Sequence, residues 1–163
     1  MKLRKLEEKD ATFMLEWMHD PDVVKDLAKD FSSMQIENCL AFIANSWEDE
    51  ENLNLAIVNE EDEYMGTVSL KEIDRENDKA EFAITIRKCA MGKGYSAYAM
   101  QEIIRIAKEE ENLDQVYWCV AEENKRAVRF YDKNGYQRIN YEALQIKTEY
   151  SQQQLAHFIW YLA

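Results

Sequence analysis

The sequence is poor in the residues on which disulfide-rich and metal-binding domains depend. Its three cysteines, Cys39, Cys89 and Cys119, are odd in number, far apart and not arranged as a CxxC pair, so they predict no disulfide framework. The two histidines, His19 and His157, stand alone, and the sequence therefore predicts no metal ion. This cysteine usage is typical of a reducing compartment, and we expect a cytoplasmic location.

Positive charge is also scarce. The 163 residues include 20 lysines and arginines against 32 aspartates and glutamates, which gives a formal net charge of -12. Surfaces that bind nucleic acids or anionic membranes need a basic face, so we expect neither partner. An acidic exterior suits a cationic small molecule, although solubility alone also explains it. No apolar run approaches the roughly 18 residues that span a bilayer, and the N-terminal stretch lacks the apolar core of a signal peptide.

Proline occurs once, at Pro21, and glycine only four times, so few positions interrupt the regular hydrophobic patterns. Asp10 and Ser33 are the expected N-caps of two helices, and the second of these helices is expected to bury a stripe that includes Leu40. Apolar residues at helical spacing predict helices at 10–18, 23–27, 33–43, 96–110 and 124–133.

A hydrophobic period of two marks the remaining segments as strands, and the three central ones form an antiparallel meander. We expect a single α/β (α+β) domain spanning residues 1–163, with a mixed, mostly antiparallel sheet of about seven strands flanked by about four helices. The expected strands lie at 2–6, 53–59, 64–74, 80–87, 115–121, 136–144 and 156–163.

Two of the four glycines, Gly92 and Gly94, lie in the stretch RKCAMGKGYSAYAM, residues 87–100, between a predicted strand and a predicted helix. Glycine lets the backbone approach a ligand without a Cβ in the way, and the unpaired N–H groups of a first helical turn attract phosphate. Lys88 and Lys93 add positive charge beside them. The stretch matches neither GxxxxGK[ST] nor GxGxxG, and an ordinary tight turn also explains it, so phosphate binding stays open on these residues alone.

A second stretch, ENKRAVRFYDKNGYQR at 123–138, predicts a helix with Asn124, Ala127 and Tyr131 along one side. Because this helix follows a buried strand, its N-terminal end is expected at the sheet edge, where α/β proteins commonly bind ligands. Taken alone, this segment favours Tyr131 as a core aromatic residue with one hydrogen bond.

Together the two stretches resemble the signatures of the GCN5-related N-acetyltransferase (GNAT) superfamily. CAMGKG at 89–94 occupies the place of its Q/R-x-x-G-x-G/A loop. The resemblance covers essentially the whole chain, is strongest over 80–136, and is closest to the branch of spermidine and ribosomal-protein-alanine acetyltransferases. The later family pattern N-x-x-A-x-x-x-Y-x-x-x-G-[FY] is matched without gaps by Asn124, Ala127, Tyr131, Gly135 and Tyr136.

The resemblance implies an N-acetyltransferase in which an amine directly attacks acetyl-CoA, the co-substrate. It places the pantetheine arm along Ile84, Thr85 and Ile86, and it brings Asn124 into contact with the cofactor. Tyr131 is implied as the acid that protonates the leaving thiolate. The residues implied for the pyrophosphate are Met91, Gly92, Lys93, Gly94, Tyr95, Ser96 and Ala97.

The chain departs from the family pattern at the first loop position, where Cys89 replaces Gln or Arg. A thiol cannot pair with a phosphate charge, so we expect backbone N–H groups and the nearby lysines to make that contact. A nucleophilic role for Cys89 is disfavoured because no histidine lies nearby in sequence to activate it. Candidates for the base that deprotonates the amine are Glu81, Glu122 and Glu123, and the sequence does not choose among them.

Acidity and the branch resemblance favour a small-molecule acceptor, a polyamine or another small cationic amine. A protein N-terminus and an amino sugar are alternatives. Trp17, Trp47 and the acidic stretch 47–52 are candidates for lining the acceptor site, although an ordinary core and a solvated charge run also explain them. A different class, a non-catalytic sensor that binds acyl-CoA, is disfavoured because Tyr131 and the loop glycines are present. The sequence leaves open a homo-oligomer, dimer or larger.

Overall fold

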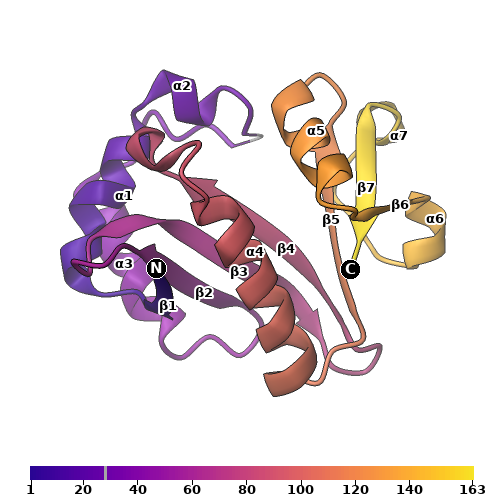
Figure 1. Cartoon of the computed structure of the whole chain (residues 1–163), viewed down its shortest axis with the longest axis horizontal. Coiled ribbons are helices and arrows are strands. Elements are labelled where there is room, and N and C mark those ends of the chain that lie inside the picture. Colours follow the sequence, from indigo (N-terminus) through magenta and orange to yellow (C-terminus); the bar gives the residue numbers. More distant parts are fainter. Residues whose placement is uncertain (28) are drawn as a thin grey trace.

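One seven-stranded sheet organises the chain in the computed structural model, which describes residues 1–27 and 29–163 (Figure 1). Its strand order is β1-β2-β3-β4-β5-β7-β6. Neighbouring strands are antiparallel except β4 and β5, which run parallel. The strands are β1 (Lys2–Lys5), β2 (Leu53–Val58), β3 (Tyr64–Asp74), β4 (Lys79–Ile86), β5 (Gln115–Ala121), β6 (Gln137–Ile139) and β7 (Phe158–Leu162).

Helices cover both faces of this sheet, and four of those described have eight residues or more. The α-helices are α1 (Ala11–Met18), α2 (Pro21–Val24), α3 (Ile36–Ser46), α4 (Tyr95–Arg105), α5 (Lys125–Lys133), α6 (Tyr141–Leu144) and α7 (Gln152–Leu155). The short segments η1 (Glu8–Asp10) and η2 (Lys88–Ala90) are 3-10 helices, and η3 (Ile106–Glu110) continues α4 as a π-helix.

The core lies in two layers on either side of the sheet. On the near face in Figure 1, the buried residues of α4 and Tyr131 of α5 share one apolar cluster with β2, β3, β4 and β5. On the far face, α1 and α3 cover β2 and the start of β3, while Leu144 of α6 packs separately against β5 and β7. The expected fold class is therefore confirmed. No helix in the described ranges is long and apolar enough to cross a membrane.

The expected strand at 136–144 is wrong beyond its first half. β6 ends at Ile139, and Tyr141–Leu144 form α6 instead. The buried ammonium group of Lys79 explains the change, because it donates to the carbonyl oxygens of Leu144, at 2.8 Å, and Gln145, at 3.3 Å. These bonds satisfy the end of α6 and hold Leu144 in the core, so a contact distant in sequence overrides the local alternation.

Helix capping also differs from the sequence expectations. Gln35, not Ser33, caps α3 through a reciprocal pair of bonds with Asn38. Leu40 is 38% exposed, because α3 turns other residues towards the sheet. Asp10 makes no side-chain cap to α1; its carboxylate instead accepts two bonds from the guanidinium of Arg4, at 2.8 and 2.9 Å.

Candidate active site

The strands β4 and β5 pair over only three residues and then separate. The pairs are Lys79 with Gln115, Ala80 with Val116 and Glu81 with Tyr117. In Figure 1 the two strands meet near the lower end of β5 and diverge upward. Beyond Glu81, β4 pairs only with β3 within the described residues, which leaves roughly 16 Å of strand edge at about 3.3 Å per residue.

This free edge contains the residues expected along the pantetheine arm. Ile84, Thr85 and Ile86 pair on one side with β3, and their other side faces the opening. An unpaired strand edge presents N–H and C=O groups to any chain of amides that lies alongside it. The structure therefore places these three residues on an unpaired strand edge, and their contact with a cofactor stays a prediction.

The loop after β4 presents a row of unused hydrogen-bond donors. Gly94 is the N-cap of α4, in a left-handed conformation with φ of 88°, and no side chain caps the helix. Gly92 has φ of 75°, and a Cβ added to it would meet nothing within 4 Å, so its surroundings are open. In the part of the chain that the structure describes, the amide N–H groups from Gly92 to Ala97 have no hydrogen-bond acceptor. Such a row at the positive end of a helix is suited to phosphate.

Tyr131 lies at the point where the two strands begin to separate. It is 9% exposed, and its ring centroid lies 5.4 Å from that of Trp118 and 5.0 Å from that of Tyr161. Burial, with smaller contributions from neighbouring groups, raises the pKa of Tyr131 above its ordinary value. The phenol is therefore protonated at neutral pH, and no residue in the described ranges accepts a hydrogen bond from it.

Asn124 has a structural role that the sequence analysis did not assign. Its side-chain oxygen accepts a bond of 3.3 Å from the N–H of Ala127 and caps α5. Across the opening, Nη1 of Arg126 lies 3.5 Å from Sδ of Met91. This contact joins the first turn of α5 to the loop, so the two signature stretches meet through residues that are 35 positions apart in sequence.

We call the point where β4 and β5 stop pairing the junction. The face of the sheet opposite Tyr131 is acidic at this junction. Glu81 lies in the last paired rung, beside Tyr117, which packs on the α6 side of the sheet. Burial raises the pKa of Glu81; Lys71 opposes this shift and Glu72 adds to it. Glu72 has a left-handed backbone, with φ of 51°, at the irregularity between Lys71 and Asp74.

Aromatic side chains adjoin these carboxylates. Burial and then the charges of Glu81 and Glu72 raise the pKa of Tyr117. Burial, followed by Cys119 and Glu81, raises the pKa of Tyr150. Burial, with Glu81, raises the pKa of the Cys119 thiol to about 12, which excludes a thiolate there at neutral pH. The face opposite Tyr131 therefore combines negative charge with aromatic surface.

Several sequence expectations do not hold in the folded chain. The ammonium group of Lys88 is 2.6 Å from a carboxylate oxygen of Asp22 and is thus already paired. Trp17 is buried in the core, where its indole N–H donates to the hydroxyl of Tyr64 at 3.0 Å. Trp47 is 52% exposed, and its indole N–H donates to the carbonyl oxygen of Leu6.

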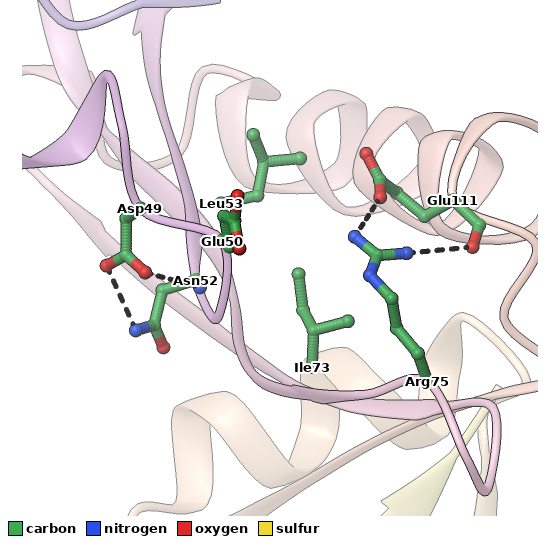
Figure 2. Close-up of a pocket in the computed structure, with 7 residues that line it drawn as sticks. All are labelled: Asp49, Glu50, Asn52, Leu53, Ile73, Arg75 and Glu111. Carbon is green, nitrogen blue, oxygen red and sulfur yellow. Dashed lines mark hydrogen bonds and ion pairs between the residues drawn. The ribbon is translucent and has the colours of Figure 1, made fainter.

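The acidic stretch after Trp47 lines a cavity of about 330 Å³ (Figure 2), together with Ile73, Arg75 and Glu111. Arg75 and Glu111 form an ion pair of 2.8 Å there. The cavity contains no residue of the expected site and lies towards the paired end of β4, where β4 begins, away from the loop. The expectation that this stretch lines the acceptor site is therefore not supported.

Folding brings together one cluster of side chains that could hold a metal ion, although one member is far from the other two in sequence. Ligand atoms of Glu122, Glu123 and His157 lie within 4.8 Å of one another, because β5 ends beside the start of β7. Nδ1 of His157 is 3.1 Å from Oε1 of Glu122. All three side chains are exposed, so we assign them no metal.

Comparisons with known proteins agree with this geometry. Residues 1–137 match the family model described as "Acetyltransferase (GNAT) domain", and the chain belongs to this family. The uncharacterized N-acetyltransferase p20 of Bacillus licheniformis is 29% identical over 146 residues, which are 85% of this chain and 79% of that protein. The chain is accordingly an N-acetyltransferase with acetyl-CoA as the acetyl donor.

Solved structures share the fold. Spermidine N-acetyltransferase from Vibrio cholerae in complex with CoA and spermine has a TM-score of 0.82 at 19% identity, over 99% of this chain and 94% of that chain. The spermidine/spermine N-acetyltransferase from Vibrio cholerae in complex with manganese ions has a TM-score of 0.73 at 20% identity, over 99% and 91%. The resemblance stated from the sequence is thus confirmed.

The loop geometry leads to a first prediction. Gly94→Val should weaken CoA binding by about 100-fold, or about 2.8 kcal/mol, because a branched side chain is strained at positive φ and crowds the free amides. Gly135→Val is the matched control, since Gly135 has φ of 78° and open space around a Cβ, but follows α5. Calorimetric titration of CoA should show near-normal affinity for the control alone. Normal affinity in Gly94→Val would mean that the loop is only a turn.

Proposed function

We propose that the protein transfers the acetyl group of acetyl-CoA to a primary amine of a small cationic molecule, with polyamines favoured. The observation that carries this proposal is the junction at Glu81 and Tyr117, where the strands separate. One side of the junction offers a free strand edge and a row of free amides. The other side offers carboxylates beside aromatic rings, an environment suited to an alkylammonium ion.

The residues around the opening fit coenzyme A. We propose that the edge of β4 from Ile84 to Ile86 pairs with the pantetheine amides, and that the loop amides from Gly92 to Ala97 hold the diphosphate. The N–H of Met91, which the sequence also implied, already donates to the carbonyl oxygen of Lys88 at 3.2 Å. Lys93 is exposed within this loop, and no described carboxylate lies within 4.0 Å of it. The side-chain oxygen of Asn124 is used by its cap, so contact with the cofactor would come from its amide nitrogen.

Two side chains on opposite faces of the junction then divide the proton transfers. Glu81 accepts a proton from the incoming ammonium group, so that the free amine attacks the acetyl carbon. Free N–H groups of the strand edge stabilise the charge that develops on the acetyl oxygen. As the carbon–sulfur bond breaks, the hydroxyl of Tyr131 gives its proton to the leaving sulfur, and the attacking nitrogen releases its second proton to solvent, from which Tyr131 is reprotonated. The raised pKa of Tyr131 keeps that donor available at physiological pH.

We also propose that residues 1–163 form one N-acetyltransferase domain. The family model ends at residue 137, but β7, at Phe158–Leu162, pairs with β5 within the same sheet. The segment after 137 therefore completes the wall of the junction rather than forming a separate unit. Homo-oligomerisation and a cytoplasmic location remain predictions.

The acceptor class can be tested with a panel of amines. We expect release of CoA with spermidine or spermine at a kcat/KM at least about 10-fold above that for an N-terminal peptide or glucosamine, because two or more charges meet the carboxylates around Glu81. A thiol assay with acetyl-CoA measures the release. A higher kcat/KM for the peptide or the sugar would overturn the polyamine assignment, and no release with any amine would overturn transfer to a small cationic amine.

Substitution of Tyr131 tests the proposed donor. Tyr131→Phe should lower kcat by about 100-fold and leave CoA affinity within a factor of two, because only the hydroxyl is removed. Tyr136→Phe is the control, since its ring contacts Trp118 in the same aromatic cluster. Steady-state kinetics and calorimetry separate the two effects. An unchanged kcat in Tyr131→Phe would remove this residue from the chemistry.

The pH dependence tests the proposed base. Glu81 acts only when ionised, so kcat/KM should fall as the pH drops through its pKa, which burial places above the ordinary glutamate value. Glu81→Gln should lower kcat/KM by at least about 100-fold and remove this acidic limb. Glu123→Gln, at an exposed carboxylate near the end of β5, should keep both the rate and the limb. Loss of the limb in Glu123→Gln alone would reassign the base.

A further inference from the structure

The loop that is proposed to hold the diphosphate is short of side-chain charge. Its first position is Cys89, an exposed thiol, where the family pattern has glutamine or arginine. The preceding residue, Lys88, is paired with Asp22 at 2.6 Å. Lys93 is thus the one cation of the segment 88–94 without an ion pair in the described part of the chain. A diphosphate carries two negative charges, so a further cation beside the loop would strengthen its binding.

The first turn of α5 brings such a cation to the loop. Arg126 is exposed, and its Nη1 lies 3.5 Å from Sδ of Met91. Met91 directly precedes Gly92, where the row of free N–H groups begins. The guanidinium group therefore contacts the side chain of the residue that directly precedes the row of donors.

The contact made by Arg126 leaves its charge unused. Thioether sulfur is a weak acceptor, and no carboxylate within the described residues lies within 4.0 Å of this guanidinium group. Most arginines that contact the core are already paired, as Arg4 is with Asp10 and Arg87 with Glu16. An uncommitted guanidinium group can exchange a weak contact for a bidentate contact with phosphate at little cost.

We propose that Arg126, on α5, supplies the positive charge for the diphosphate that the loop lacks because its first position is Cys89. On binding, its guanidinium group leaves Sδ of Met91 and pairs with the diphosphate held by the amides that begin at Gly92. This inference rests on the proposed function, because it assumes that the loop binds CoA. If the inference holds, positions 89 and 126 are alternative sources of one positive charge. An arginine at either position should then pair with the diphosphate.

The chain contains a matched control for Arg126. Arg129 is the same residue type on the same helix, is also exposed, and has no ion pair within the described residues. It lies three positions further along α5, and the structure gives it no contact with the loop. A purely general effect of positive charge on α5 would affect both residues alike.

The inference is tested by calorimetric titration of CoA into four variants: Arg126→Gln, Arg129→Gln, Cys89→Arg and the double variant Cys89→Arg with Arg126→Gln. Arg126→Gln should weaken affinity about tenfold, which is about 1.4 kcal/mol, and Arg129→Gln by less than about twofold. In the Cys89→Arg background, the Arg126→Gln change should cost less than about threefold, because the two positions act on one charge. Circular dichroism and thermal unfolding of each variant check that the fold is retained.

Three results would overturn this inference. Unchanged affinity in Arg126→Gln would remove its contact with the cofactor, and an equal loss in both backgrounds would show that Cys89 and Arg126 are independent. A third titration uses 3′-dephospho-CoA, with which the loss in Arg126→Gln should persist; its disappearance would assign Arg126 to the 3′-phosphate. Failure of the unsubstituted protein to bind CoA would overturn the proposed function itself, and this inference with it.

Discussion

The site depends on one constraint, the early end of pairing between β4 and β5. After three residue pairs the parallel ladder stops at Glu81 and Tyr117, and the rest of β4 keeps one free edge. Continued pairing would have filled that edge with β5 and left no place for a chain of amides. Because the two strands separate within the sheet, side chains from both faces reach the same junction, with Tyr131 on one side and Glu81 on the other.

The fold places positive and negative charges on different sides of the opening, which the net charge of the chain does not show. The chain carries a formal charge of -12, yet Lys93, Lys125, Arg126 and Arg129 lie in the loop and the first turns of α5 at the open end, with no ion pair among the described residues. Carboxylates instead surround the opposite face, where they raise the pKa of Tyr117. An anionic donor and a cationic acceptor would thus approach from different sides and meet at the junction.

Much of the fold followed from local patterns, and the exceptions have identifiable causes. A period of two located the strands at 53–59, 64–74 and 80–87 because successive side chains of a strand point to opposite faces of the sheet. It failed at 136–144, where the ammonium group of Lys79 binds the end of α6. Proximity in sequence also suggested Lys88 as one of two lysines that add charge beside a phosphate, although the fold pairs it with Asp22. In both of these failures the deciding partner lies more than 60 residues away, beyond the reach of any local pattern.

The sequence by itself determined the class of the fold, the family and the two stretches that are proposed to form the site. Three features could be predicted from neighbouring residues alone: glycines that tolerate positive φ, the start of a helix, and a tyrosine at a fixed spacing. Only the tertiary structure decided where β4 and β5 part, which cations remain free, and that Arg126 meets Met91 across the opening. These features depend on packing between segments far apart in the chain, because burial and charge pairing are set by neighbours in space rather than in sequence.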